Sequence, residues 1–208
     1  MILSKPHLIL VRHSESEGNI NSEIYRNNPD WKVDLTFNGR QQTFKLGSML
    51  NSLIPNHAVS IIYSPYRRAE LTAKIISKSF GNRATLTEDA RLREQNWGNY
   101  SEHINPCTLQ EKEEYSEFFY QIAGGESVAQ VYDRAVQFMH NLVVTDKTII
   151  LVSHGIFLRT LTMYLNKIPA SQFPQIKRLN NCDADIYDFI NINSDINLIC
   201  GIRNLQIV

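Results

Sequence analysis

The chain has 208 residues, of which 43% are hydrophobic and 20% charged, and its 21 basic residues balance its 21 acidic ones. This composition indicates a folded domain and excludes the strong net field that attracts nucleic acid or an anionic membrane. The longest apolar runs are much shorter than the ~20 residues that a membrane span needs, so we expect no membrane partner.

Along the chain, apolar runs typical of strands alternate with patterns typical of amphipathic helices. We expect strands at 7–12, 59–63, 84–87, 148–153 and 185–190, with edge pieces near 197–202 and 205–208. Helices are expected at 39–54, from Pro65 to 80, after a capping box of Ser127 and Gln130, and after His154. The alternation predicts an α/β fold, a three-layer sandwich with a mostly parallel central sheet and helices on both faces.

The chain shows no repeat, low-complexity tract or linker, so we expect a single domain spanning residues 1–208. The segment at about 95–125 is rich in Tyr, Phe and Glu and fits none of the expected elements. Long connections of this kind are often binding loops or lids. We therefore expect this insertion to cover the substrate at the carboxyl ends of the strands.

The three cysteines, Cys107, Cys182 and Cys200, are widely spaced and form no C-x-x-C pair. Such an odd, scattered set indicates free thiols in a reducing compartment. No secretory signal precedes the first expected strand, so we expect a cytoplasmic protein. Glu15, Glu17 and the nearby histidines do not form a convincing set of metal ligands, so no metal is expected.

Charged residues follow the expected strands where each strand ends. Arg12 and His13 follow the first strand, Arg68 the second, Glu94 the third and His154 the fourth. Because ligands in such sheets bind beyond the carboxyl ends of the strands, these side chains can converge on one site. Two arginines can share the oxygens of a phosphoryl group, and a neutral imidazole can attack phosphorus. Each residue alone is more typical of an exposed or capping position, and only the set points to phosphoryl chemistry.

Several short motifs, in a fixed order, resemble those of the histidine phosphatase superfamily, in the branch that includes the cofactor-dependent phosphoglycerate mutases. The similarity runs from Leu8 to Arg159 and rests on an ordered set rather than on Arg-His alone. The motifs are Arg-His-Ser-Glu-Ser-Glu-Gly-Asn at 12–19, Leu-Thr-x-x-Gly at 35–39, Ser-Pro-Tyr-Arg-Arg-Ala at 64–69, Leu-Arg-Glu-Gln-Asn-Trp-Gly at 92–98, Gly-Gly-Glu-Ser at 124–127 and Ser-His-Gly at 153–155.

The resemblance implies a metal-independent phosphomonoester hydrolase with no cofactor. His13 would be the nucleophile that becomes phosphohistidine, and Glu94 would be the general acid and then the base. The phosphoryl group would be held by Arg12, Arg68 and His154, with Asn19 and Gly155 also in the phosphate pocket. The substrate would be a small-molecule or protein phosphomonoester, and the sequence indicates neither its identity nor the oligomeric state.

Two departures from the family pattern bear on function. Ser14 stands where the family usually has glycine. After Gly98 the chain lacks the basic residues that would hold a second phosphate and a carboxylate in a true mutase. A 2,3-bisphosphoglycerate-dependent phosphoglycerate mutase is therefore the lesser alternative, and a non-catalytic phosphate-binding scaffold is a further one.

A narrower similarity links the chain to fungal and plant phosphoglycerate-mutase-like phosphatases, which implies acid phosphatase activity. It rests on short segments at 29–36, 91–95, 118–122 and 179–182.

Overall fold

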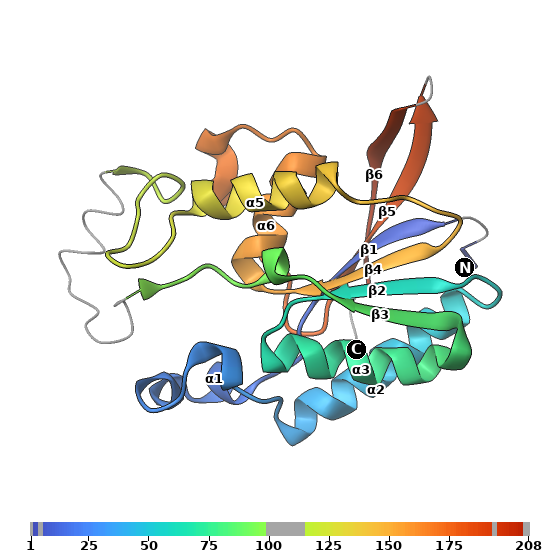
Figure 1. The fold of residues 1–208 in the computed structure, drawn as a ribbon, viewed down its shortest axis with the longest axis horizontal. Coiled ribbons are helices and arrows are strands. Elements are labelled where there is room, and N and C mark those ends of the chain that lie inside the picture. Colours follow the sequence, from blue (N-terminus) through green and yellow to red (C-terminus); the bar gives the residue numbers. More distant parts are fainter. Residues whose placement is uncertain (1, 4–5, 99–114, 193–194, 206–208) are drawn as a thin grey trace.

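The computed structural model describes residues 2–3, 6–98, 115–192 and 195–205. A six-stranded sheet forms its centre, with the strand order β3-β2-β4-β1-β5-β6 (Figure 1). Its strands are β1 (His7–Arg12), β2 (Val59–Tyr63), β3 (Ala84–Glu88), β4 (Thr148–Ser153), β5 (Ala184–Ile192) and β6 (Asp195–Leu205).

The four strands from β3 to β1 pair in parallel, and β5 and β6 extend the sheet as antiparallel strands. The predicted fold class, a mostly parallel sheet covered on both faces, is confirmed. The bounds predicted for β1, β2 and β4 match the structure. The edge piece predicted near 197–202 lies within a longer strand, β6, which pairs with β5, and the piece predicted near 205–208 falls almost entirely outside the described residues. Residues 206–208 lie outside the described residues.

Two helical layers enclose the sheet (Figure 1). One layer contains α2 (Phe37–Leu53) and α3 (Arg67–Phe80), and the other contains α5 (Val128–His140) and α6 (Gly155–Leu165). Shorter elements connect them: α1 (Glu17–Ile20), η1 (Ser22–Arg26), η2 (Asp30–Lys32), η3 (Gly81–Arg83), η4 (Ala90–Leu92) and η6 (Ala170–Gln175).

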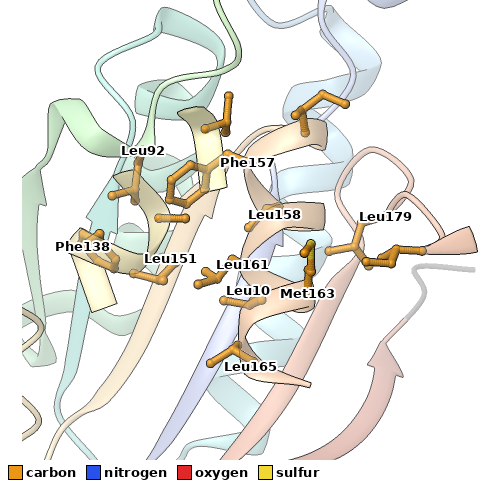
Figure 2. Packing of buried hydrophobic residues seen from close by; sticks show 14 of the residues in the cluster. Leu10, Leu92, Phe138, Leu151, Phe157, Leu158, Leu161, Met163, Leu165 and Leu179 are labelled. Carbon is orange, nitrogen blue, oxygen red and sulfur yellow. The ribbon is translucent and has the colours of Figure 1, made fainter. Parts of the chain in front are cut away.

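β1 and β4 are aliphatic between their polar ends because each face of the sheet meets a helical layer. Leu8 and Leu10 of β1 pack in the cluster under α5 and α6, whereas Ile9 and Val11 pack under α2 and α3. Successive side chains of a strand point to opposite faces, so a strand buried on both faces needs apolar residues at every position. Figure 2 shows the first cluster, in which Leu10 and Leu151 lie against Phe157, Leu158 and Leu161 of α6.

Helix α2 begins two residues earlier than expected because Thr36 is its N-cap. The Thr36 hydroxyl accepts a hydrogen bond from the Gly39 N–H over 2.9 Å, as N-cap threonines do. A Cβ at Gly39 would lie 2.0 Å from the Glu15 carbonyl oxygen, so only glycine lets α2 approach the loop that follows β1 this closely. This contact fixes the loop that contains His13.

On α3 the inward face differs from the one expected. Ile76 is buried as predicted, but Leu71 and Ile75 are only partly buried. Small residues, Ala69 and Ala73, take the inner face instead and bring the helix close to the sheet. No helix within the described residues is long and apolar enough to cross a membrane.

The structure describes only part of the predicted insertion at 95–125, because residues 99–114 lie outside the described residues. Of its described aromatic residues, Phe118 is buried in the core cluster and Phe119 is exposed. Whether the insertion covers a substrate therefore stays a prediction.

Candidate active site

The carboxyl ends of β1 and β4 bring two histidines together. Arg12 and Ser153 are partners in the parallel register, and the His13 N–H donates to the Ser153 carbonyl oxygen over 2.9 Å. The next residue after each strand end is thus a histidine, and the ring centroids of His13 and His154 lie 5.2 Å apart. Both rings are buried, at 3% and 0% exposure. The predicted convergence of these two residues is therefore observed.

His13 is held in one orientation by two hydrogen bonds. Its Nδ1 lies 2.8 Å from the Ser14 carbonyl oxygen, and its Nε2 accepts from the Nε–H of Arg68 over 3.3 Å. A carbonyl can only accept, so Nδ1 has the proton and Nε2 has the lone pair. Burial, followed by the positive charges of Arg68 and Arg12, holds the pKa of His13 well below its usual 6.5. His13 is therefore a neutral imidazole near pH 7, as a nucleophile requires.

Ser14, which departs from the family's glycine, points away from the site. Its hydroxyl lies 2.5 Å from the Thr43 hydroxyl of α2, and its N–H donates to the Thr72 hydroxyl of α3 over 3.2 Å. Ser14 is fully buried between the two helices. Ser14 therefore anchors the loop that contains His13 to the helical layer.

The two arginines predicted to hold the phosphoryl group are both buried. Arg68 lies in the first turn of α3, and its Nη1 donates to the backbone carbonyl of Asp30 over 2.7 Å and to the Asp30 carboxylate over 2.8 Å. Arg12 donates from Nη1 to the Leu179 carbonyl oxygen over 2.7 Å, while its buried Nε has no partner among the described residues. Burial, followed by the charge of Arg178, lowers the pKa of Arg12 to about 10.

His154 is the N-cap residue of α6 and stacks edge-on with Tyr66, at 5.1 Å between ring centroids. Its Nε2 lies 2.7 Å from the Ser64 hydroxyl, and its buried Nδ1 has no partner among the described residues. Burial, then the charge of Arg68, holds the pKa of His154 well below 6.5. The ring is thus neutral, with one nitrogen committed to Ser64 and the other available to a ligand.

Glu94 lies at the N-terminus of α6, where backbone N–H groups have no partner within the helix. Its carboxylate accepts from the N–H of Ile156 over 3.1 Å and from that of Phe157 over 3.3 Å. The side chain is 4% exposed. Glu94 and His154 are therefore positioned by the same helix end, and the predicted acid lies beside the predicted phosphate site.

A buried ion pair beneath the site holds the backbone on which Glu94 lies. Arg134 of α5 donates to the carbonyl oxygens of Arg91, Arg93 and Glu94 over 2.6, 2.7 and 3.0 Å, and to both carboxylate oxygens of Glu126 over 3.1 Å. Burial would raise the pKa of Glu126, but hydrogen bonds from Arg134 and the Asn96 N–H outweigh it and lower that pKa. Through Glu126 and Arg134, the Gly-Gly-Glu-Ser motif thus holds the backbone of residues 91–94, which we call the acid loop.

Asn19 and Gly155, the two other residues predicted for the phosphate pocket, reach the site through neighbouring residues. Asn19 is exposed, and its amide oxygen accepts from the Ser16 N–H over 2.9 Å and from Asn181 over 3.0 Å. Gly155 is buried at the start of α6, and a Cβ there would lie 2.1 Å from Nε of Arg178. Asn19 is therefore adjacent to the His13 loop through Asn181, and Gly155 lies under a third arginine.

Sequence reasoning missed three residues that the fold brings to this site: Asp30, Arg178 and Asn181. Asn181 donates to the His13 carbonyl oxygen over 3.1 Å, and Cys182, at a φ of 66°, donates its N–H to the same oxygen over 3.3 Å. Asp30 begins the short helix η2, Arg178 and Asn181 lie in the loop before β5, and none of them belongs to a periodic pattern. The segments at 29–36 and 179–182, which resemble a eukaryotic subgroup, contain Asp30 and Asn181, but that resemblance assigns neither residue a role.

A sequence profile described as the histidine phosphatase superfamily (branch 1) matches residues 8–198. The chain belongs to this superfamily. A phosphoglycerate mutase-like protein of Arabidopsis thaliana is 30% identical to it over 205 residues, which cover 87% of this chain and 73% of the relative. An acid phosphatase of Mycobacterium tuberculosis is 28% identical over 167 residues, covering 79% of this chain and 78% of the relative.

The solved structure of a mycobacterial glucosyl-3-phosphoglycerate phosphatase superposes with a TM-score of 0.77 at 22% identity, over 97% of this chain and 99% of that one. This likeness shows that the two proteins share their fold over nearly the whole of this chain.

Proposed function

We propose that this member of the histidine phosphatase superfamily hydrolyses phosphomonoesters through a phosphohistidine on His13. The observation on which this rests most is the state of His13, a buried neutral ring with its Nδ1 proton on the Ser14 carbonyl and its Nε2 beside Arg68. A neutral nitrogen fixed next to a guanidinium is suited to attack a phosphoryl group that the same guanidinium holds.

In the first step, the Nε–H of Arg68 moves from Nε2 of His13 to a phosphoryl oxygen, the freed Nε2 lone pair attacks phosphorus, and the ester P–O bond breaks. Glu94 gives its proton to the leaving alkoxide, which departs as an alcohol. Arg12 and Arg68, with Nδ1–H of His154, stabilise the charge on the phosphoryl oxygens. In the second step, Glu94 takes a proton from water, the oxygen attacks phosphorus, and the P–N bond breaks to release phosphate and free His13.

His154 fits this role in one tautomer. Phosphoryl oxygens need a donor, so Nδ1 must have the proton and Nε2 must accept from Ser64. The Ser64 oxygen accepts from the Tyr66 N–H over 3.3 Å, which leaves its own proton to donate to Nε2 over 2.7 Å. The surroundings of Ser64 therefore support the tautomer that the mechanism needs.

The test is phosphate release in EDTA from p-nitrophenyl phosphate and 3-phosphoglycerate, comparing the wild type with His13→Ala. We expect EDTA-resistant release that falls by about 10³-fold or more in the variant, as for other covalent catalysts. Release that persists in His13→Ala would contradict the proposal. Isomerisation of 3-phosphoglycerate that depends on 2,3-bisphosphoglycerate, without net release, would instead favour a mutase. Phosphate binding without either reaction would favour a scaffold.

A further inference from the structure

Arg178 is a charged residue at the site to which the proposed mechanism gives no task. It lies in the loop between η6 and β5, and its side chain is 51% exposed. Its guanidinium rests on Gly155, since a Cβ there would lie within 2.6 Å of its Nε, Cζ and Nη2 atoms. Its nearest acid is Glu94, with Nη2 at 4.0 Å from Oε2, beyond hydrogen-bond distance.

The other site arginines are engaged by protein groups, whereas Arg178 donates no hydrogen bond to any described residue. Arg12 donates to the Leu179 carbonyl, Arg68 to Asp30 and His13, and Arg134 to Glu126. Arg178 contributes to the low pKa of both Arg12 and His13, so its positive charge acts within the site. Arg178 is thus a half-exposed cation beside the site whose N–H groups donate to no described residue.

The position of Glu94 decides which part of a substrate Arg178 faces. In the proposed mechanism Glu94 protonates the ester oxygen, so it lies on the leaving-group side of the phosphorus. A guanidinium beside Glu94 therefore lies close to the first atoms of the leaving group. A guanidinium fork matches the paired oxygens of a carboxylate or phosphate.

We infer that Arg178 binds a second anionic group on the leaving-group part of the substrate, so that the preferred substrates are phosphomonoesters with a carboxylate or second phosphate near the ester oxygen. This inference rests on the proposed phosphatase function. It also explains why position 155 is a glycine, because any Cβ there would occupy the space of the Arg178 guanidinium.

Matched substrate pairs test the inference. 3-Phosphoglycerate and glycerol 3-phosphate differ only by a carboxylate in place of a hydroxymethyl group. Propane-1,3-diyl bisphosphate and 3-hydroxypropyl phosphate differ by a second phosphate. We expect wild-type kcat/KM to favour at least one anionic member, and Arg178→Gln to lower that preference by about tenfold or more, the effect of a lost charge-assisted hydrogen bond. The neutral members should lose at most about fivefold. The pair that responds identifies the anion.

One further variant is a matched control, and another is an independent test of the same contact. Lys177→Gln removes the same charge one residue away, and it should leave the preference within about twofold. Gly155→Ala should lower the preference in the same direction as Arg178→Gln, because its Cβ would displace the guanidinium. An equal loss on both members of each pair would place Arg178 on the phosphoryl group and overturn the inference, as would an unchanged preference.

Binding separates this inference from the proposed function. In the His13→Ala background, calorimetry should show tighter binding of the anionic members, and adding Arg178→Gln should abolish that difference. If the wild type hydrolyses no ester but the binding difference depends on Arg178, the phosphatase proposal fails and the anion site stands. If hydrolysis is seen but neither difference depends on Arg178, the anion site fails alone.

Discussion

Arg68 donates its Nε–H to Nε2 of His13 over 3.3 Å, so the arginine predicted to hold the phosphoryl group also touches the predicted nucleophile. The remaining donors of Arg68 are partly taken by Asp30, which fixes the guanidinium plane. A phosphoryl oxygen that binds Arg68 is therefore brought next to Nε2. Burial lowers the pKa of His13 most and Arg68 adds to it, and in the proposed mechanism the same arginine positions the phosphoryl group.

The first prediction concerns the ionisation of His13. Its pKa is lowered by burial and then by Arg68, so we expect it to stay neutral well below pH 6.5 and to protonate only in more acidic solution. Removing the charge in Arg68→Gln should raise that pKa toward 6.5. The measurement is the titration of the His13 Cε1 proton by NMR. Arg67→Gln removes a half-exposed charge one residue away and should change little. A His13 that titrates near 6.5 in the wild type would refute the electrostatic argument.

The second prediction concerns the tautomer of His154. Ser64→Ala removes the hydroxyl that lies 2.7 Å from Nε2, so Nε2 becomes free to take the proton from Nδ1. We expect kcat to fall by about tenfold, because a deprotonated Nδ1 repels phosphoryl oxygens. Nitrogen NMR of the His154 ring should show the tautomer change, and Ser64→Thr should restore part of the activity. A loss of kcat with the tautomer unchanged would assign Ser64 a packing role instead.

The third prediction concerns the proton that Glu94 supplies. Glu94→Gln keeps an oxygen for the N–H groups of Ile156 and Phe157, so the fold should be preserved. Alkyl phosphates need their leaving group protonated and should lose about 10²- to 10³-fold in kcat/KM, which reports the step that releases the leaving group and not the later hydrolysis of phosphohistidine, within the usual range for general acids. An aryl phosphate such as p-nitrophenyl phosphate leaves as a stable anion and should lose less than about tenfold. Equal losses on both classes would be incompatible with a proton-donating Glu94.

The sequence predicted the centre of this fold better than its margins. β1, β2 and β4 were bounded correctly because strands buried in a parallel sheet are aliphatic runs with polar ends. The piece predicted at 197–202 was shorter than β6 because an edge strand is not forced to be apolar on both faces. The first residues of α2 and α3 each lie two residues from the predicted starts, where caps such as Thr36 decide the boundary.

For the site, the residues found from the sequence are those that follow strands. His13 and His154 come directly after β1 and β4, and parallel pairing alone brings them together. Asp30, Arg178 and Asn181 lie in connecting segments whose paths depend on many weak contacts, and their residue types alone suggest a solvated loop. Their positions could be known only once the backbone was placed.

The last prediction concerns the ion pair under the acid loop. Glu126→Gln leaves the buried guanidinium of Arg134 without its counter-charge, although it keeps three backbone carbonyls. We expect the free energy of unfolding at pH 7 to fall by roughly 2–3 kcal/mol, the scale of hydrogen bonds to charged groups. Glu117→Gln breaks a more exposed pair with Arg159 and should cost about 1 kcal/mol or less.

The pH dependence distinguishes the charge of Glu126 from its shape. The pKa of Glu126 is lowered in the folded protein, so its contribution is complete above its unfolded value of 4.5 and is lost as the pH falls through the folded value. The stability difference between the wild type and Glu126→Gln should therefore shrink as the solution is acidified below pH 4.5. Urea unfolding at pH 7 and at successively lower pH measures it. A difference that does not change with pH would mean that Glu126 acts through packing, because only the carboxylate gains from Arg134.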